Sequence, residues 1–502
     1  MDFILEVVRI INTHRVQRVE ILGEHYGEKS KYSQLYQGIK EGKISSDKDA
    51  ATLLYDGDVN NLNYKKFKFR FRQRLIDTLF FIDTNAPNFT DIQSAYYNCY
   101  KNWAAIRILF GKSAKRSAVI LAEKLLRQAL KFEFTEIILN LSRVLRLHYA
   151  TVIGSKRKFK VYDELLKSQL FILEAETKVE ELYEDLLIEF VNSRATKGGF
   201  SEKAQQYIDE LSPYLGKVNT FNFIFFSHTI MVLRYEIIND HNNVVEKCLE
   251  AISALQLKPF TLKGQFFPFL FKILSAYLKM GRYEEIPSIA QKCTQVIDEG
   301  TINWFKFHQV YFQYLLHIEE YEEALIVLEK ITLHPRLKFQ SQDTRENWKI
   351  FSAYMYFLSS LGLIADDKFS KKNKRMFRLG KFLNEVPAFT KDKRGFNISI
   401  LIIQVLVFLC DKKYNAIFDR INALERYSTR YLRRNDTFRS NCFIKMLILI
   451  PKGHFNRMAV ERHTENYSKQ LKSMPLSQAN QSSEIEIIPY DRLWEYILRL
   501  LD

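Results

Sequence analysis

The stretch that decides the fold begins with FFPFLFKILSAYLKMGRYEEIPSIAQKC (residues 266–293) and continues with WFKFHQVYFQYLLHIEEYEEALIVLEKI (residues 304–331). In each part an apolar helix is followed by a short polar turn, and Tyr-Glu-Glu then begins a second amphipathic helix. Tyr283 and Tyr321 hold the same place in the two units, 38 residues apart. A period of a few tens of residues, each a helix hairpin, indicates an all-α solenoid.

The two units resemble the tetratricopeptide (TPR) repeat family. Tyr277 fits the aromatic position of the first helix, Gly281 the turn glycine, and Tyr283 the tyrosine that begins the second helix. In the second unit Tyr321 and Ala324 match, whereas a glutamate replaces the turn glycine. The tryptophan and glycine of the family's first helix are missing from both units, so the chain is TPR-like with irregular repeats.

This resemblance implies a concave groove that binds a protein or peptide. In the second unit the groove would be lined by Lys306, Gln309 and Gln313 of the first helix. We therefore expect a non-enzymatic scaffold or adaptor without a cofactor.

The composition agrees with helices joined by short turns. The chain of 502 residues contains only 17 glycines and 10 prolines, which disfavours a turn-rich β fold. Its hydrophobic content of 47% excludes disorder over most of the length. No apolar run reaches the roughly 18 to 20 residues that span a bilayer, so we expect no membrane span.

Cysteine usage suggests a reducing compartment. The five cysteines show no metal-ligand spacing, and they are Cys99, Cys248, Cys293, Cys410 and Cys442. The first residues lack a basic leader and a small-residue cleavage site, so we expect no secretory signal. We predict a cytoplasmic protein with reduced thiols in its cores and no bound metal.

Residues 1–85 are predicted to form a small helical N-terminal module. Its last segment, residues 63–83, alternates phenylalanines and basic residues, which is also compatible with a strand. A helix is favoured, because one apolar stripe then contains Tyr64, Phe67, Phe71, Leu75 and Leu79. One basic edge of this helix would be formed by Lys66, Arg70 and Arg74.

Two roles are open for this basic helix. Several short helices ending in a basic aromatic helix are compatible with a DNA-reading module. The favoured alternative is that the helix docks on the solenoid and directs its charges to solvent over buried rings.

Residues 91–472 are predicted to form the TPR-like solenoid, with its clearest repeats in 266–335. A hairpin of Phe221–Ile238 and Asn243–Leu255 extends the array backward, since Asn243 precedes Tyr283 by 40 residues. Residues 473–502 should form a polar linker and a terminal helix. Further helices are expected at residues 91–110, 113–131, 134–150, 159–173, 176–195 and 201–214.

Positive charge is concentrated near the C-terminal end. The chain has 74 basic and 58 acidic residues, a net charge of +16. Residues 365–475 contain 24 basic and 10 acidic residues, a net +14. This segment is a candidate for binding a polyanion or an acidic protein surface. The candidate residues there are Lys371, Lys372, Lys374, Arg375, Arg430, Arg433 and Arg434.

Signals of catalysis are weak. Gly111-Lys112-Ser113 resembles the end of a phosphate-binding loop, but Ile106 stands where the first glycine is required. Two functional hypotheses follow. The favoured one is a scaffold or adaptor for a protein or peptide. The alternative is a nucleic-acid-associated regulator that uses the basic N-terminal helix, the basic C-terminal segment or both.

Overall fold

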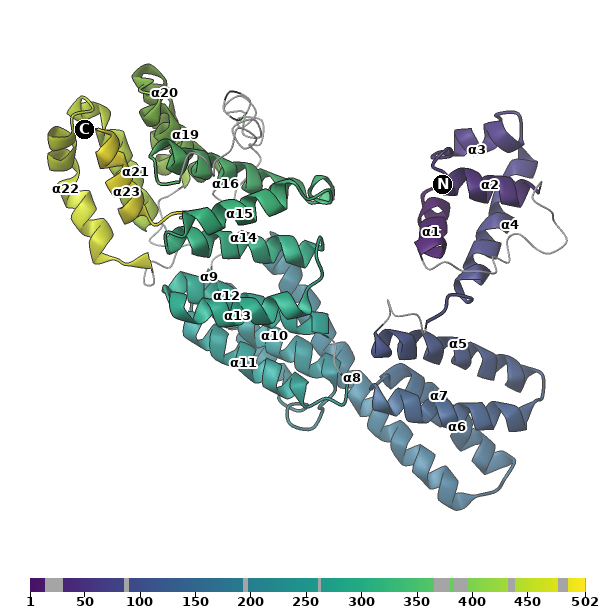
Figure 1. The fold of residues 1–502 in the computed structure, drawn as a ribbon. Helices are drawn as coiled ribbons and strands as arrows, with labels where there is room; N and C mark the ends of the chain where they lie inside the picture. The colour runs from purple at the N-terminus through teal and green to yellow at the C-terminus, as the bar shows by residue number, and fades with distance from the viewer. Residues whose placement is uncertain are drawn as a thin grey trace. The chain divides into compact units, whose positions relative to one another are not determined.

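The computed structural model is built of helices, and all of the regular secondary structure in its described residues is helical (Figure 1). The all-α class is therefore confirmed. The chain divides into two compact units, residues 1–174 and 175–502, and each is treated by itself. The structure describes residues 1–13, 30–84, 90–192, 197–260, 263–364, 380, 382, 396–431, 438–476 and 486–501.

The first unit begins with four helices around one hydrophobic core. They are α1 (Asp2–Thr13), α2 (Lys31–Lys40), α3 (Asp47–Leu54) and α4 (Leu62–Leu79). The prediction of a helix rather than a strand is confirmed by α4, which ends at Leu79 and not at residue 83. Tyr64, Phe67, Phe71 and Leu75 recur at helical spacing and all pack into this core. The apolar stripe of α4 is therefore covered by α1–α3.

Three further helices follow in the first unit, and a fourth begins there and continues into the second unit. They are α5 (Asp91–Gly111), α6 (Lys115–Lys131), α7 (Thr135–Thr151) and α8 (Lys156–Asn192). Helices α5, α6 and α7 pack in sequence order around a second hydrophobic cluster. The prediction of two helices at residues 159–173 and 176–195 was wrong. The sequence FILEAETK at 171–178 contains no glycine or proline to stop a helix, and α8 runs through it.

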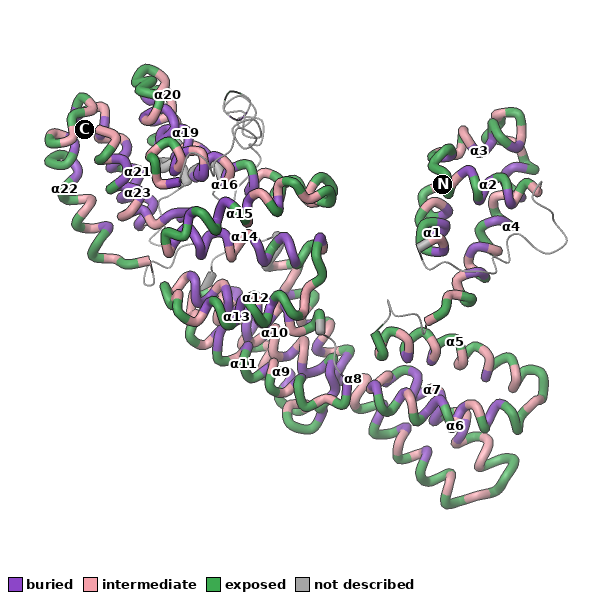
Figure 2. Tube along the Cα trace, in the orientation of Figure 1, coloured by how far each residue is buried: buried purple, intermediate pink, exposed green. Residues whose placement is uncertain are grey.

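The second unit is an array in which neighbouring helices pack in sequence order, the arrangement of an α-solenoid (Figure 1). In Figure 2 the buried residues form stripes along the facing sides of these helices. Its helices are α9 (Lys197–Leu211), α10 (Phe221–Ile237), α11 (His241–Gln256), α12 (Lys263–Met280), α13 (Ile286–Val296), α14 (Ile302–His317), α15 (Tyr321–Thr332), α16 (Gln342–Ser360), α19 (Phe396–Cys410), α20 (Tyr414–Tyr431), α21 (Phe438–Leu449), α22 (Arg457–Ser473) and α23 (Tyr490–Leu500).

One turn recurs between the helices of the hairpins. Gly281 has a left-handed φ of +67°, and the amide of Arg282 donates to the carbonyl of Tyr277 at 2.9 Å. Glu319 repeats this geometry with a φ of +66°. Each residue ends one helix, and the next helical turn begins two residues later. The same turn occurs at Ser113, Glu133, Asn239 and Lys412.

This turn corrects the predicted alignment of one hairpin. Asn239 occupies the place of Gly281, so His241, rather than Asn243, is equivalent to Tyr283. The α10–α11 hairpin does extend the array backward, as predicted, but two residues out of the expected register.

No helix within the described residues is both long enough and apolar enough to cross a membrane.

Candidate functional site

The three predicted cations of α4 have different environments. Lys66 and Arg70 are exposed, whereas Arg74 is half-buried. The guanidinium of Arg74 lies 4.1 Å from the centre of the Tyr32 ring, a cation–π contact inside the module. Only Lys66 and Arg70 of this set are therefore fully open to a ligand.

A fourth cation of α4 is held by a carboxylate of the module. Lys68 Nζ lies 2.6 Å from Asp47 Oδ1, and the hydroxyl of Tyr64 donates to the same oxygen at 2.7 Å. Burial raises the pKa of Asp47, but the hydrogen bonds from Lys68 and Tyr64 outweigh it and lower the pKa to about 2. This contact ties α4 to the beginning of α3.

Helix α5 carries a tyrosine patch that the sequence analysis did not single out. We define it as Tyr96, Tyr97 and Tyr100, which are 45%, 49% and 38% exposed. The ring of Tyr96 lies 4.7 Å from that of Tyr100, and Tyr100 donates a hydrogen bond to Glu136 of α7 at 3.1 Å. The patch is thus an ordered aromatic surface held against α7.

The predicted groove residues of α14 do not share one exposed face. Lys306 is exposed and Gln309 is half-buried, but Gln313 is only 5% exposed and lies in the core. Gln313 therefore has no open surface to offer a peptide. The repeat-defining residues Tyr321 and Ala324 are buried, in line with a packing role.

Most of the predicted C-terminal basic cluster lies outside the described residues. This applies to Lys371, Lys372, Lys374, Arg375, Arg433 and Arg434. The backbone of Arg430 belongs to α20, and its side chain is not among those described.

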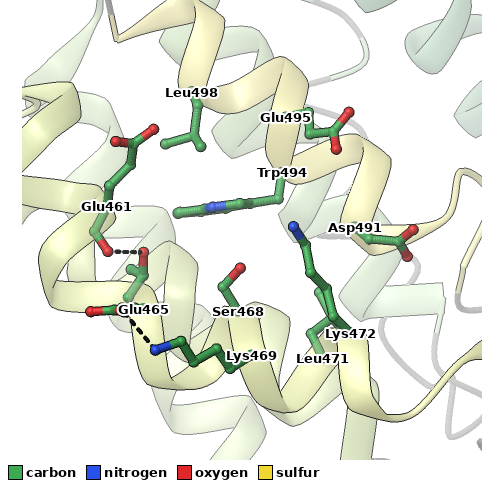
Figure 3. A pocket seen from close by; sticks show the side chains of 11 residues that line it. Glu461, Glu465, Ser468, Lys469, Leu471, Lys472, Asp491, Trp494, Glu495 and Leu498 are labelled. Carbon is green, nitrogen blue, oxygen red and sulfur yellow. Dashed lines mark hydrogen bonds and ion pairs between the residues drawn. The ribbon is translucent and has the colours of Figure 1, made fainter.

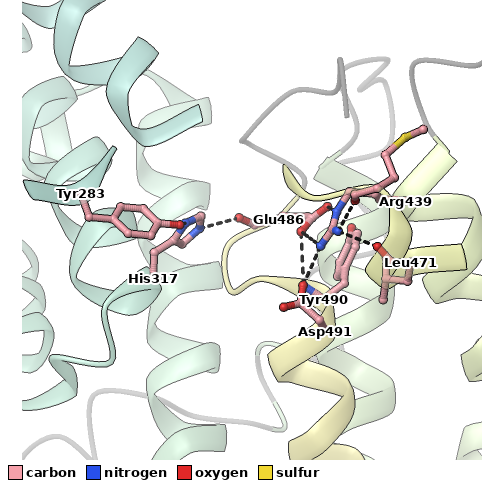
Figure 4. A network of polar contacts seen from close by, with 8 residues as sticks. Tyr283, His317, Arg439, Leu471, Glu486, Tyr490 and Asp491 are labelled. Atoms are coloured by element: carbon pink, nitrogen blue, oxygen red, sulfur yellow. Dashed lines mark hydrogen bonds and ion pairs between the residues drawn. The ribbon is translucent and has the colours of Figure 1, made fainter. Parts of the chain in front are cut away.

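Arg439, in the same basic region, is buried and fully paired. Its side chain is 2% exposed, and its Nε donates to Glu486 Oε1 at 2.8 Å while Nη2 donates to Glu486 Oε2 at 3.1 Å (Figure 4). Nη2 also reaches Asp491, and Nη1 donates to the carbonyls of Leu471 and Met474. Burial lowers the pKa of Arg439, but pairing with Glu486 and Asp491 outweighs it and raises the pKa.

This ion pair belongs to a network that reaches the second repeat unit (Figure 4). His317, at the end of α14, has Nε2 at 3.2 Å from the carbonyl oxygen of Glu486 and Nδ1 at 3.1 Å from the hydroxyl of Tyr283. A carbonyl only accepts, so Nε2 carries the proton and Nδ1 accepts from Tyr283. Burial lowers the pKa of His317 to about 4, which keeps the ring neutral.

A cavity of about 340 Å³ lies between α22 and α23 (Figure 3). Its carboxylates are largely matched by neighbouring cations: Glu461 pairs with Arg457, and Glu465 pairs with Lys469. The cavity is lined by Glu461, Thr464, Glu465, Ser468, Lys469, Leu471, Lys472, Asp491, Trp494, Glu495 and Leu498.

The five cysteines and the sequence that resembles the end of a phosphate-binding loop both have structural roles. All five cysteines are unbonded, and burial raises the pKa of Cys248 and Cys293 to about 12, so these thiols stay protonated. Gly111-Lys112-Ser113 is one of the recurring left-handed helix turns rather than a strand-to-helix loop. No group of three or more potential metal ligands occurs in the described ranges.

These features define an all-α protein of helix hairpins with a tyrosine patch on α5 and a basic face on α4. No family model, no curated protein and no solved structure matches this chain.

Proposed function

We propose that this chain is a non-enzymatic scaffold or adaptor that binds a protein or peptide on its helical array. The observation that carries the proposal is the tyrosine patch of α5, where three large aromatic side chains gather on one exposed surface. Tyrosine is enriched in protein interfaces, because it provides a large rigid contact area and a hydroxyl that can form hydrogen bonds.

The arrangement of the patch supports this role. The ring of Tyr96 lies 5.5 Å from that of Phe134, measured between ring centres, and Tyr100 donates a hydrogen bond to Glu136. These contacts hold both tyrosine rings in place before a partner binds. A preordered surface loses less conformational entropy on binding, which favours affinity. The TPR-like character remains part of the proposal, with the docking surface on α5 in place of the groove that was to include Gln313.

The test is affinity capture by the immobilised full-length chain from a lysate of its native host, with and without nuclease. We expect a protein partner that survives nuclease treatment and is lost with Tyr96→Ala/Tyr97→Ala. The matched control is Leu147→Ser, which changes another exposed apolar residue of the same unit and should leave capture unchanged. Loss of every partner on nuclease treatment, or equal capture by the double variant, would contradict the proposal.

A further inference from the structure

The outer face of α4 places an aromatic ring among cations. Phe69 is 63% exposed, although Phe67 and Phe71 on either side of it are buried. Residues three and four apart share a helix face, so Lys65 and Lys66 lie one turn before Phe69. All three side chains are open to solvent, as is Arg70 beside them. The exposed ring is therefore the centre of a basic surface.

The cations of α4 divide into two groups. Lys68 is bound to Asp47, Arg72 lies 4.2 Å from the centre of the Phe3 ring, and Arg74 lies over Tyr32. By contrast, Lys66 and Arg70 form no hydrogen bond or ion pair with any residue that the structure describes, and Lys65 donates one long hydrogen bond of 3.4 Å to the exposed Asn60. The module thus engages one group internally and leaves the other available.

The charge around Phe69 is of one sign up to Ile76, and the exposed Asp77 is the first acidic residue after it. Residues 59–76 contain six basic residues and no acidic one. This local excess of positive charge favours an anionic partner. Cations at i and i+4, such as Lys66 and Arg70, are about 6 Å apart along the helix axis, and successive backbone phosphates can be contacted by such a row.

We propose that the outer face of α4 binds single-stranded nucleic acid. Lys65, Lys66 and Arg70 contact backbone phosphates, and Phe69 stacks on an unpaired base. Exposed aromatic rings beside a positively charged path are the means by which proteins hold single strands without sequence preference. In a duplex the base faces are covered by neighbouring bases, so Phe69 would have no face on which to stack.

A second ring extends the same face. Phe80 follows Phe69 by eleven residues, three helical turns, and returns to the same side of the helix about 16 Å further along. It is about half exposed. The basic part of the face therefore lies around Phe69, and Phe80 offers a second stacking ring beyond Asp77. This binding goes beyond the adaptor function and does not depend on it, because it uses α4 rather than the tyrosine patch.

The test is fluorescence anisotropy of the full-length chain with short labelled single-stranded DNA, single-stranded RNA and duplex DNA, from about 50 to 200 mM salt. Single strands should bind at low salt, and the DNA and RNA arms show which sugar is preferred. Lys66→Glu/Arg70→Glu should weaken binding at least about tenfold and reduce the salt slope by about 1.4, since each phosphate contact contributes about 0.7 on single strands. Phe69→Ala should weaken single-strand binding at least about fivefold, with little effect on duplex, and Phe69→Trp should retain it.

The matched control is Lys115→Glu/Arg116→Glu, two exposed cations at the start of α6. It makes the same change in net charge and should leave single-strand affinity within about twofold, while circular dichroism confirms the helical fold of every variant. Four outcomes would overturn the proposal. These are no binding of single strands at the lowest salt, equal weakening by the control, an unchanged affinity with Phe69→Ala, and binding to anionic lipid vesicles without binding to oligonucleotides.

Discussion

Arg70 on α4 and Arg439 on α21 are the same residue type in basic regions of the sequence, but they have opposite environments. Arg70 is exposed and has no partner among the described residues. Arg439 is buried and donates to two carboxylates and two carbonyls. The comparison shows that a run of basic residues in the sequence does not tell which of their charges are exposed at the surface.

The difference arises from what each arginine can reach. A buried guanidinium is stable only when its five N–H donors all find acceptors. For Arg439 the carboxylates come from Glu486 and Asp491, 47 and 52 residues later in the chain. On α4, Lys68 pairs with Asp47, and no carboxylate of the described residues pairs with Arg70, so its charge remains directed to solvent. The +14 of residues 365–475 is therefore only partly available to a ligand.

The largest expected effect is a difference in stability when each of the two arginines is replaced by methionine. Arg439→Met leaves the carboxylate of Glu486 buried without its partner, and we expect a loss of about 3–5 kcal/mol in the free energy of unfolding. Arg70→Met should change it by less than about 0.5 kcal/mol.

Urea unfolding followed by tryptophan fluorescence is a suitable measurement for Arg439→Met, since Trp304, Trp348 and Trp494 belong to the second unit. For Arg70→Met the reporter is Trp103 of the first unit. Arg439→Met/Glu486→Gln should recover part of the loss, because it no longer leaves a buried charge unpaired. If Arg439→Met lowers the free energy of unfolding by less than about 1 kcal/mol, the ion pairs of Arg439 with Glu486 and Asp491 do not stabilise the second unit as proposed.

The stability of the second unit should also depend on pH in a way that differs from that of the N-terminal module. Burial depresses the pKa of His317, His308 and His241 to about 4, so below pH 6.5 the unfolded state binds protons that the folded state does not. The second unit should therefore lose stability as the pH falls from about 6.5 to about 4, by up to about 1.4 kcal/mol per pH unit for each histidine.

Replacing His317 tests its share of this effect. His317→Gln should be less stable than the wild type at pH 7, but about 2 kcal/mol of the wild type's loss between pH 7 and pH 5 should disappear. In the N-terminal module the pKa of Asp47 is lowered to about 2, so its contribution to stability is fully present above the unfolded value near 3.8 and is lost as the pH falls from there to about 2. The measurement is the urea unfolding midpoint of wild type and His317→Gln between pH 7 and pH 5. Equal loss of stability in the two proteins would contradict a lowered pKa of His317.

The recurring turn offers the converse comparison, in which different residues share one environment. At Gly281 a Cβ would meet no atom within 4 Å, so Gly281→Ala costs only backbone strain, about 1 kcal/mol. Lys412→Gly relieves the same strain and should stabilise by up to about 1 kcal/mol. Thermal unfolding should show a lower melting temperature for Gly281→Ala and a higher one for Lys412→Gly. A lower melting temperature for Lys412→Gly would mean that the lysine side chain stabilises the fold by more than its left-handed backbone destabilises it.

Helix positions followed closely from local pattern. The ends of α6, α7, α14 and α15 fall within two residues of the predicted or quoted segments, because apolar spacing and polar turns act over a few residues. The turn was predicted at Gly281 and, in the second unit, at the glutamate that replaces this glycine, Glu319. At Glu133, Glu319 and Lys412 ordinary residues adopt the same left-handed φ, since helix packing on both sides outweighs their preference.

The sequence by itself determined the all-α class, most helices, and the concentration of positive charge, because these depend on composition and on neighbours within about one helical turn. Only the tertiary structure decided which charges are free. It buried Arg439 against Glu486, engaged Arg74 with Tyr32, put Gln313 in the core and left Phe69 exposed between buried rings. These outcomes depend on partners elsewhere in the fold, because a buried polar side chain is stabilised by a protein partner, whereas an exposed one is satisfied by water.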